Sequence, residues 1–257
     1  MILDDIMKYR REQLAREKIA VPEEDMKRLA LECSRPARGF KAAISRPGVN
    51  IISEVKKASP SKGVISADFR PVETAINYQN SGAAAISVLT EEHYFMGSSE
   101  YLKAIRQAVD IPIIRKDFIF DPYQIYEARV IGADAVLLIA ALLTADEMRE
   151  LRLLAESLGL DVLYESHNEE EIQTCIAAGA SIFGINNRNL KTFEVTLDTT
   201  EKLAKLVPEG SVIVSESGMF TASDVLRVHS CGANAVLIGE SLMRDPSLLS
   251  QIREAVQ

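Results

Sequence analysis

Charged residues that can exchange protons stand at the ends of apolar runs in this sequence. NIISEV is followed by two lysines, so Glu54, Lys56 and Lys57 close a segment that otherwise looks buried. Lys116 ends PIIRK, and Glu165 follows the apolar residues of VLYES. Lysines and carboxylates that meet in one place perturb each other's pKa values, as the groups of acid–base sites do. These residue types indicate general acid and base chemistry, provided that the fold brings the segments together.

Eight short apolar runs are candidate strands that would position these side chains. Amphipathic segments of helical period lie between the runs, and several of them open with Asp or Thr. Four similar segments, beginning at residues 81, 131, 178 and 231, each pair a helix-ending Gly with an apolar run. The predicted strands are Asn50–Val55, Ala84–Leu89, Pro112–Lys116, Ala135–Ile139, Val162–Glu165, Ile182–Ile185, Val212–Ser215 and Ala235–Ile238.

Near-continuous apolar strands that alternate with helices are typical of a parallel sheet covered on its outside. A doubly wound open sheet is the alternative, but it usually has fewer strands and a GxGxxG turn, which is absent after the first run. We therefore predict an α/β fold, a (β/α)8 TIM barrel, formed by residues 1–257 as a single domain. Residues 1–45 have helical spacing and precede the first strand as an extension.

The carboxyl ends of barrel strands and the loops after them form the site in this fold. Strand alternation places Glu54 and Lys56 on one face and Lys57 on the other, so we assign the first two to the barrel mouth. A strand end that simply emerges into water is the alternative for any single residue. The corresponding ends of other strands carry Lys116, Glu165, Asn186, Arg188, Glu216 and Ser217.

Glycines after the last two predicted strands indicate a phosphate site. Gly218 lies in SESG and Gly239 in LIGES, where backbone amides can approach an anion. A short helix that begins at Glu240 would point its amino terminus at the same place. A single glycine would also fit an ordinary turn, so the prediction of a phosphate site rests on finding glycines in both loops.

Composition excludes several classes of protein. The chain has 29 Lys and Arg against 37 Asp and Glu, a net charge of −8, which disfavours nucleic acid as a partner. No apolar stretch approaches the ~20 residues of a membrane span, and the opening residues lack the pattern of a signal peptide. We expect a cytoplasmic protein that does not bind membranes.

Cysteines and histidines show no metal-site or triad spacing. The three cysteines are far apart and fit buried free thiols, Cys33, Cys175 and Cys231. Of the three histidines, only His167 lies near a strand end, and we expect it to form a loop hydrogen bond rather than to catalyse.

Six segments together resemble the indole-3-glycerol-phosphate synthase family: SEVKKASPSKG, IRKDFIFDPYQ, YESHNEEE, INNRNLKTFEV, SESGM and LIGESLM. The resemblance implies a barrel whose extension, residues 1–45, lies over the mouth. It also implies a carbon–carbon lyase (carboxy-lyase) of tryptophan, and thus aromatic amino acid, biosynthesis. The implied substrate is 1-(2-carboxyphenylamino)-1-deoxyribulose 5-phosphate, which is converted to indole-3-glycerol phosphate, carbon dioxide and water.

The resemblance also implies roles for site residues. Lys116 would be the general acid of ring closure, Lys56 would contact the substrate carboxylate, and Glu165 would accept a proton as indole forms. The implied catalytic set is Glu54, Lys56, Lys116, Glu165, Asn186, Glu216 and Ser217. The implied substrate-binding set is Ser59, Pro60, Phe95, Phe118, Arg188 and Leu190, and the phosphate-binding set is Gly218, Gly239 and Glu240. No metal and no organic cofactor are implied.

Other readings remain open from the residues alone. A sugar-phosphate isomerase or a Schiff-base aldolase could use Lys56 or Lys116. A barrel that binds a phosphorylated ligand without turnover is the non-enzymatic alternative. We expect a monomer with a small phosphorylated substrate, and the sequence does not decide whether other enzymes of the pathway associate with it.

Overall fold

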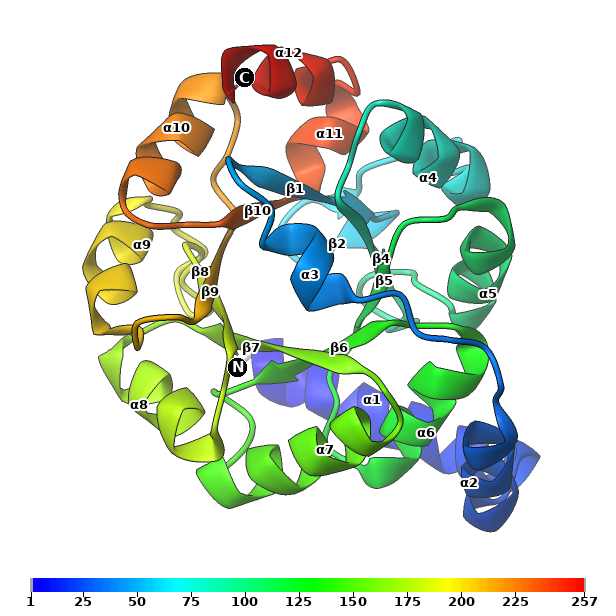
Figure 1. Cartoon of the computed structure of the whole chain (residues 1–257). Coiled ribbons are helices and arrows are strands. Elements are labelled where there is room, and N and C mark those ends of the chain that lie inside the picture. Colours follow the sequence, from blue (N-terminus) through cyan, green and yellow to red (C-terminus); the bar gives the residue numbers. More distant parts are fainter. Residues whose placement is uncertain (1, 257) are drawn as a thin grey trace.

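Eight parallel strands close into a barrel in the computed structural model, which describes residues 2–256. Met1 and Gln257, the two ends of the expected domain, lie outside the described residues. Figure 1 looks along the barrel, with the helices arranged around the strands. The strands are β1 (Asn50–Val55), β4 (Ala85–Leu89), β5 (Ile113–Lys116), β6 (Ala135–Ile139), β7 (Asp161–Ser166), β8 (Ile182–Asn186), β9 (Val212–Glu216) and β10 (Ala235–Ile238). The predicted (β/α)8 barrel is confirmed, and each strand boundary agrees to within one residue.

Helices that follow the strands cover the outside of the barrel. Several begin at a residue whose side-chain oxygen accepts a backbone N–H of the first turn, as Asp121, Thr144 and Asn168 do, which explains where these helices start. The helices are α4 (Pro71–Asn80), α5 (Ser99–Ala108), α6 (Pro122–Ile131), α7 (Ala145–Ser157), α8 (Glu169–Ala178), α9 (Asp198–Leu203), η1 (Ala204–Leu206), α10 (Ala222–Ser230), α11 (Glu240–Arg244) and α12 (Leu248–Val256).

Alternate strand residues divide between two apolar clusters. One set fills the inside of the barrel, and the other packs outward against the helices. Helix α3 (Phe40–Ile44) adds Phe40 and Ile44, both fully buried, to the inner cluster. Because this cluster includes residues near the amino ends of the strands, such as Ile52 and Ala135, α3 closes that end of the barrel.

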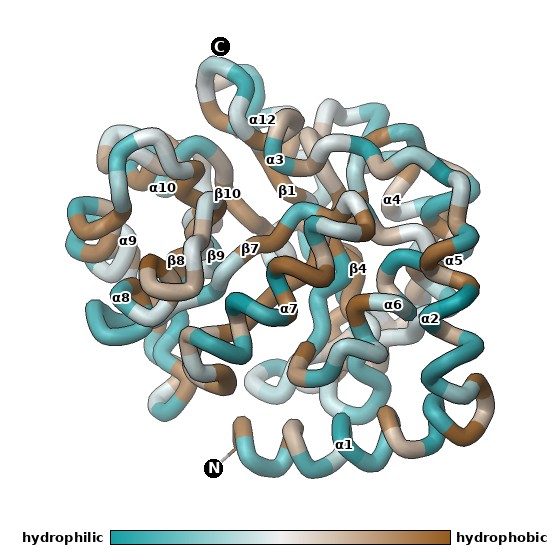
Figure 2. Tube along the Cα trace, turned by 60° about the horizontal axis from the view of Figure 1, so that its bottom comes forward, coloured by the Kyte–Doolittle hydropathy of each residue, from teal (hydrophilic) through white to brown (hydrophobic). Residues whose placement is uncertain are grey.

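Helices α1 (Ile2–Ala20) and α2 (Glu23–Glu32) precede the barrel. In Figure 2, α1 and α3 lie at opposite ends of the molecule. Helix α1 brings Ile2, Leu3 and Ile6 to the cavity at the carboxyl ends of the strands, whereas α2 packs against α6. Within the segment 1–45, α1 therefore covers the mouth and α3 closes the far end.

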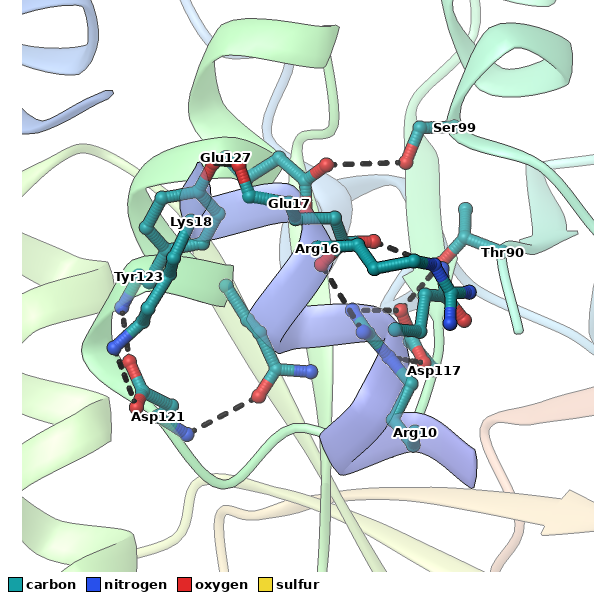
Figure 3. A network of polar contacts seen from close by, with 12 residues as sticks. Arg10, Arg16, Glu17, Lys18, Thr90, Ser99, Asp117, Asp121, Tyr123 and Glu127 are labelled. Carbon is teal, nitrogen blue, oxygen red and sulfur yellow. Dashed lines mark hydrogen bonds and ion pairs between the residues drawn. The ribbon is translucent and has the colours of Figure 1, made fainter. Parts of the chain in front are cut away.

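A buried polar network attaches α1 to the loop after β5 (Figure 3). Arg10 Nε donates to Asp117 Oδ1 over 2.9 Å, and both side chains are fully buried. Asp117 Oδ2 accepts hydrogen bonds from Arg115 Nη2 and Thr90 Oγ1 at 2.9 and 2.7 Å. Burial disfavours the carboxylate, but Arg10 and Arg115 outweigh it and lower the pKa of Asp117 below its usual range. The helix over the mouth is thus fastened to the residue that follows Lys116.

The loop after β1 forms a small hairpin that was not expected from the sequence. Strands β2 (Ala58–Ser59) and β3 (Gly63–Val64) pair antiparallel, and Gly63 has a φ of 65°. A positive φ is accessible to glycine at little cost, which explains this residue at the turn.

None of the helices described for residues 2–256 is long and apolar enough to cross a membrane.

Candidate active site

One cavity at the carboxyl ends of the strands contains every site residue proposed from the sequence. Helix α1 and the loops after β1, β8 and β9 enclose it above the barrel interior. The proposed residues among its lining are Glu54, Lys56, Ser59, Pro60, Phe95, Lys116, Phe118, Glu165, Asn186, Arg188, Leu190, Glu216, Ser217, Gly218, Gly239 and Glu240. Lys57 is absent from the described lining, as strand alternation predicts.

Lys116 forms the centre of the charged part of the cavity. Its Nζ lies 2.9 Å from Glu165 Oε2 and 2.8 Å from Glu216 Oε2. Burial alone would lower the pKa of Lys116, but the two carboxylates outweigh it and raise the pKa well above its usual range. Lys116 is therefore a cation at neutral pH, held between carboxylates of β7 and β9, neither of which is next to β5 in the barrel.

The two carboxylates beside Lys116 have opposite pKa shifts. Burial raises the pKa of Glu216, and Lys116 only partly offsets that effect. Burial acts in the same direction on Glu165, but Lys116 and then His167 outweigh it, so the pKa of Glu165 lies well below its usual range. Paired acids whose pKa values are pushed apart are a feature of acid–base sites, with Glu165 here the ionised member.

Lys56 and Glu54 form a second ion pair at the mouth. Lys56 Nζ donates to Glu54 Oε1, and the Glu54 side chain is almost fully buried. The backbone at Gly239 lies directly against this pair. A Cβ added at Gly239 would lie 2.2 Å from Glu54 Oε1 and 2.9 Å from Lys56 Nζ. The glycine between β10 and α11 thus leaves the space that the ion pair occupies.

Gly239→Ala is expected to lower kcat/KM about 10²-fold, because displacing the Glu54–Lys56 pair by an ångström misplaces a reacting group. Steady-state kinetics on the purified variant measure this. Gly39→Ala is the matched control, since its added Cβ meets nothing closer than Ala42 Cβ at 3.5 Å. Equal kcat/KM values for the two variants would contradict the assigned role of Gly239.

Phe95 and Phe118 form part of the apolar wall of the cavity. The rings of Phe95 and Phe118 have centroids 6.0 Å apart and are tilted by 43°. Glu91, a buried residue not predicted from the sequence, holds the loop of Phe95 by accepting backbone N–H groups of Tyr94 and Phe95 at 2.8 and 2.9 Å. No sequence pattern distinguishes Glu91 from an exposed loop acid.

The loop after β9 is held in an unusual backbone conformation. Ser217 has a φ of 64°, in the left-handed region that residues other than glycine rarely adopt, and Gly218 follows with a φ of 87°. Asn187 Nδ2 donates to the backbone oxygens of Glu216 and Ser217 at 3.1 and 3.0 Å. This buried amide, also missed from the sequence, stabilises the strained turn, a type of feature that clusters at functional sites.

Gly184 in the middle of β8 makes room for Glu216. A Cβ at this position would lie 2.3 Å from Glu216 Oε1. An isolated glycine inside a strand indicates that another group approaches closely, so the sequence alone could have identified Gly184 as such a position.

Arg188 and the residues predicted to bind phosphate also line the cavity. Arg188 N donates to Asn186 Oδ1 over 3.0 Å, which connects Arg188 to the end of β8. Gly239 is the residue before α11, and the Glu240 side chain accepts from Arg244 Nε at 3.2 Å. Among residues 2–256, no cluster of His, Cys, Asp and Glu is arranged to hold a metal ion.

Comparisons with known proteins cover almost the whole chain. The family model described as Indole-3-glycerol phosphate synthase matches residues 3–255. A relative of that name from Endomicrobium trichonymphae is 50% identical over 255 residues, covering 99% of each chain. Another from Lachnospira eligens is 53% identical over 262 residues, covering 99% of this chain and 97% of the relative.

Solved structures share the fold at low sequence identity. KGPDC from Streptococcus mutans superposes with a TM-score of 0.61 at 14% identity, covering 81% of this chain and 97% of that one. The N-acetylmannosamine-6-phosphate 2-epimerase from Clostridium perfringens gives a TM-score of 0.60 at 15% identity, covering 80% and 93%. At these identities the likeness supports the barrel fold alone.

Proposed function

This chain belongs to the indole-3-glycerol phosphate synthase family, and from that premise we propose how its cavity carries out the reaction. The chain is a decarboxylating lyase of tryptophan biosynthesis. Its proposed substrate is 1-(2-carboxyphenylamino)-1-deoxyribulose 5-phosphate. The observation that carries the proposal is the Lys116 ammonium held by two carboxylates in a cavity that also contains Lys56 and Arg188.

Lys116 is the general acid of ring closure. The aromatic carbon that bears the carboxylate attacks the ribulose carbonyl carbon, and Lys116 gives its proton to the carbonyl oxygen as negative charge develops there. Loss of carbon dioxide then returns the bonding electrons to the ring. An alkoxide oxygen is basic enough to take this proton even though the pKa of Lys116 is raised.

Glu165 is the general base of the last step. Lys56, oriented by Glu54, supplies the proton with which the hydroxyl leaves as water, and Glu165 accepts a ring proton as indole forms. Transfer of the Lys116 proton to substrate removes the charge that lowers the pKa of Glu165. The first step therefore makes Glu165 a stronger base for the last one.

Binding groups surround the reacting atoms. Phe95, Phe118, Pro60 and Leu190 enclose the aromatic ring, and Arg188 clamps the substrate carboxylate, for which a planar two-pronged donor is suited. Asn186 and Glu216 position the substrate hydroxyl group and the catalytic groups, and Ser217 lies near the phosphate contacts. The phosphate contacts are the Ser59 side chain and the backbone amides of Gly218, Gly239 and Glu240.

Glu165→Gln is expected to lower kcat about 10³-fold, because the amide cannot accept the ring proton. Purified protein is mixed with the aminodeoxyribulose phosphate, and formation of indole is followed by its fluorescence. Glu169→Gln, an exposed acid at the start of α8, is the control and should keep wild-type turnover. The proposal fails if the wild-type protein forms no indole product or if Glu165→Gln turns over like the control.

The remaining features of the protein are also proposed. Residues 1–257 form a single barrel domain with an extension at 1–45, and the protein acts as a cytoplasmic monomer on one small phosphorylated substrate. It binds neither nucleic acid nor membranes. Its net charge of −8 supports the absence of nucleic acid binding. Its separated cysteines support a location in the reducing cytoplasm.

A further inference from the structure

His167 lies between two carboxylates directly behind the proposed general base. It follows β7, and its Nε2 is 3.3 Å from Glu165 Oε1. On the other side of the ring, Nδ1 is 2.9 Å from Glu171 Oε2. The loop hydrogen bond expected for this histidine is the one to Glu171, and the fold also places its Nε2 beside Glu165.

The imidazole ring is held rigidly. Glu171 Oε2 also accepts the backbone N–H of His167 at 2.8 Å, so one carboxylate oxygen fixes both the ring and its backbone. Glu171 is in the first turn of α8, where its own N–H donates to Oδ1 of the capping residue Asn168 at 2.9 Å. The amino terminus of a helix stabilises a negative charge at this position. The ring orientation is thus set by the start of α8.

The surroundings of His167 favour its charged form. Its side chain is 10% exposed, and the buried Nε2 has no hydrogen-bond partner among the described residues, so its 3.3 Å contact with Glu165 Oε1 is that of an ion pair. Burial opposes the charge, but the Glu165 and Glu171 carboxylates outweigh it and raise the pKa of His167 to about 10. A cation therefore stands beside Glu165 at neutral pH, on the side away from Lys116.

The contacts of Glu165 divide between its two oxygens. Oε2 faces Lys116, the group that is proposed to lose its proton to substrate. Oε1 accepts from Asn186 Nδ2 at 3.1 Å and faces His167 Nε2. The Oε1 contacts remain when the Lys116 proton moves, so they can keep the carboxylate in place during the reaction. Because His167 is absent from the described cavity lining, it acts through Glu165 and does not touch substrate.

We propose that His167 is a positioning residue for Glu165, with its Nε2 held beside Oε1 by the Glu171 carboxylate at the start of α8. The proposal rests on the role of Glu165 as the general base. The proposal adds His167, and Glu171 of α8 behind it, to the cavity residues that support turnover.

Two amide replacements test this assignment with nearly the same chemistry. The Gln side-chain nitrogen is as many bonds from Cα as Nε2 of histidine, whereas the Asn nitrogen matches Nδ1. His167→Gln can donate to Glu165, and His167→Asn can reach only toward Glu171. We expect His167→Asn to lower kcat about tenfold with KM changed less than about twofold, and His167→Gln to stay within about threefold of the wild-type kcat.

A purely structural role would give a different pattern. Thermal unfolding midpoints are measured for both variants, and His229→Asn is the control, since His229 Nδ1 is hydrogen-bonded to the nearby Ala233 carbonyl oxygen at 2.8 Å. Equal kcat values for His167→Gln and His167→Asn, or a loss confined to KM, overturn the proposal.

A double-mutant cycle separates this inference from the proposed function. In the Glu165→Gln background, His167→Asn should cause no further loss of kcat, because there is no carboxylate left to position. A further tenfold loss overturns the inference. If Glu165→Gln alone keeps wild-type turnover, the proposed general base is wrong. If it is inactive while His167→Asn turns over normally, only the role of His167 is wrong.

Discussion

Lys116→Ala is expected to lower kcat about 10⁴-fold, the upper end of the contribution of a general acid. The change removes the proton donor for ring closure and also leaves Glu165 and Glu216 without the ammonium that lies 2.9 and 2.8 Å from them. One of the two carboxyl groups must then take up a proton, because two like charges cannot stay ionised side by side in a buried site. Single-turnover kinetics with the aminodeoxyribulose phosphate measure the loss.

Lys116→Arg separates charge from proton transfer. The guanidinium keeps the positive charge but does not give up its proton, and its planar fork differs from the compact ammonium. We expect it to recover less than about tenfold of the lost activity, while Lys57→Ala, a lysine outside the described cavity lining, keeps wild-type kcat. Wild-type turnover by Lys116→Arg would show that charge alone suffices.

Arg10→Met is expected to lower the free energy of unfolding by about 3 kcal/mol, because it removes one partner of a buried ion pair. Arg10 and Asp117 are fully buried, and burial disfavours the Asp117 charge that Arg10 offsets. Arg115 remains bonded to Asp117 at 2.9 Å, which places the effect at the lower end of the usual range of about 3–5 kcal/mol. Urea denaturation followed by circular dichroism measures it.

Arg16→Met is the matched control on the same helix. Arg16 pairs with Glu92 at 3.4 Å, but the two side chains are 65% and 54% exposed, so the loss should be below about 0.5 kcal/mol. If both arginine variants lose the same small amount, the Arg10–Asp117 pair does not fasten α1 to the barrel.

Local pattern was sufficient to predict the barrel. Parallel strands buried on both faces are apolar almost throughout, so runs such as Ala135–Ile139 stand out from the amphipathic helices between them. Helix starts were also visible, since Asp121 and Thr144 open α6 and α7. The β2–β3 hairpin was missed because strands of two residues, Ala58–Ser59 and Gly63–Val64, are too short for any periodicity.

The cavity residues were predictable because of a rule about the fold and not because of their neighbours in sequence. Once eight parallel strands are recognised, their carboxyl ends must meet at one rim, so Lys116 and Glu216, 100 positions apart, are expected near each other. The resemblance of the six motifs to the family then implied a role for each residue. Their roles stay predictions until the variants above are measured.

Residue types and their periodicity by themselves determined the barrel, the rim at which chemistry is expected and the charged groups that reach it. The tertiary structure alone decided which groups touch: Arg10 with Asp117 across 107 positions, Gly239 against the Glu54–Lys56 pair, and His167 turned toward Glu165. The physical reason is that strand and helix periods are set by local backbone geometry, whereas a side-chain contact depends on distances that form only when the chain closes on itself.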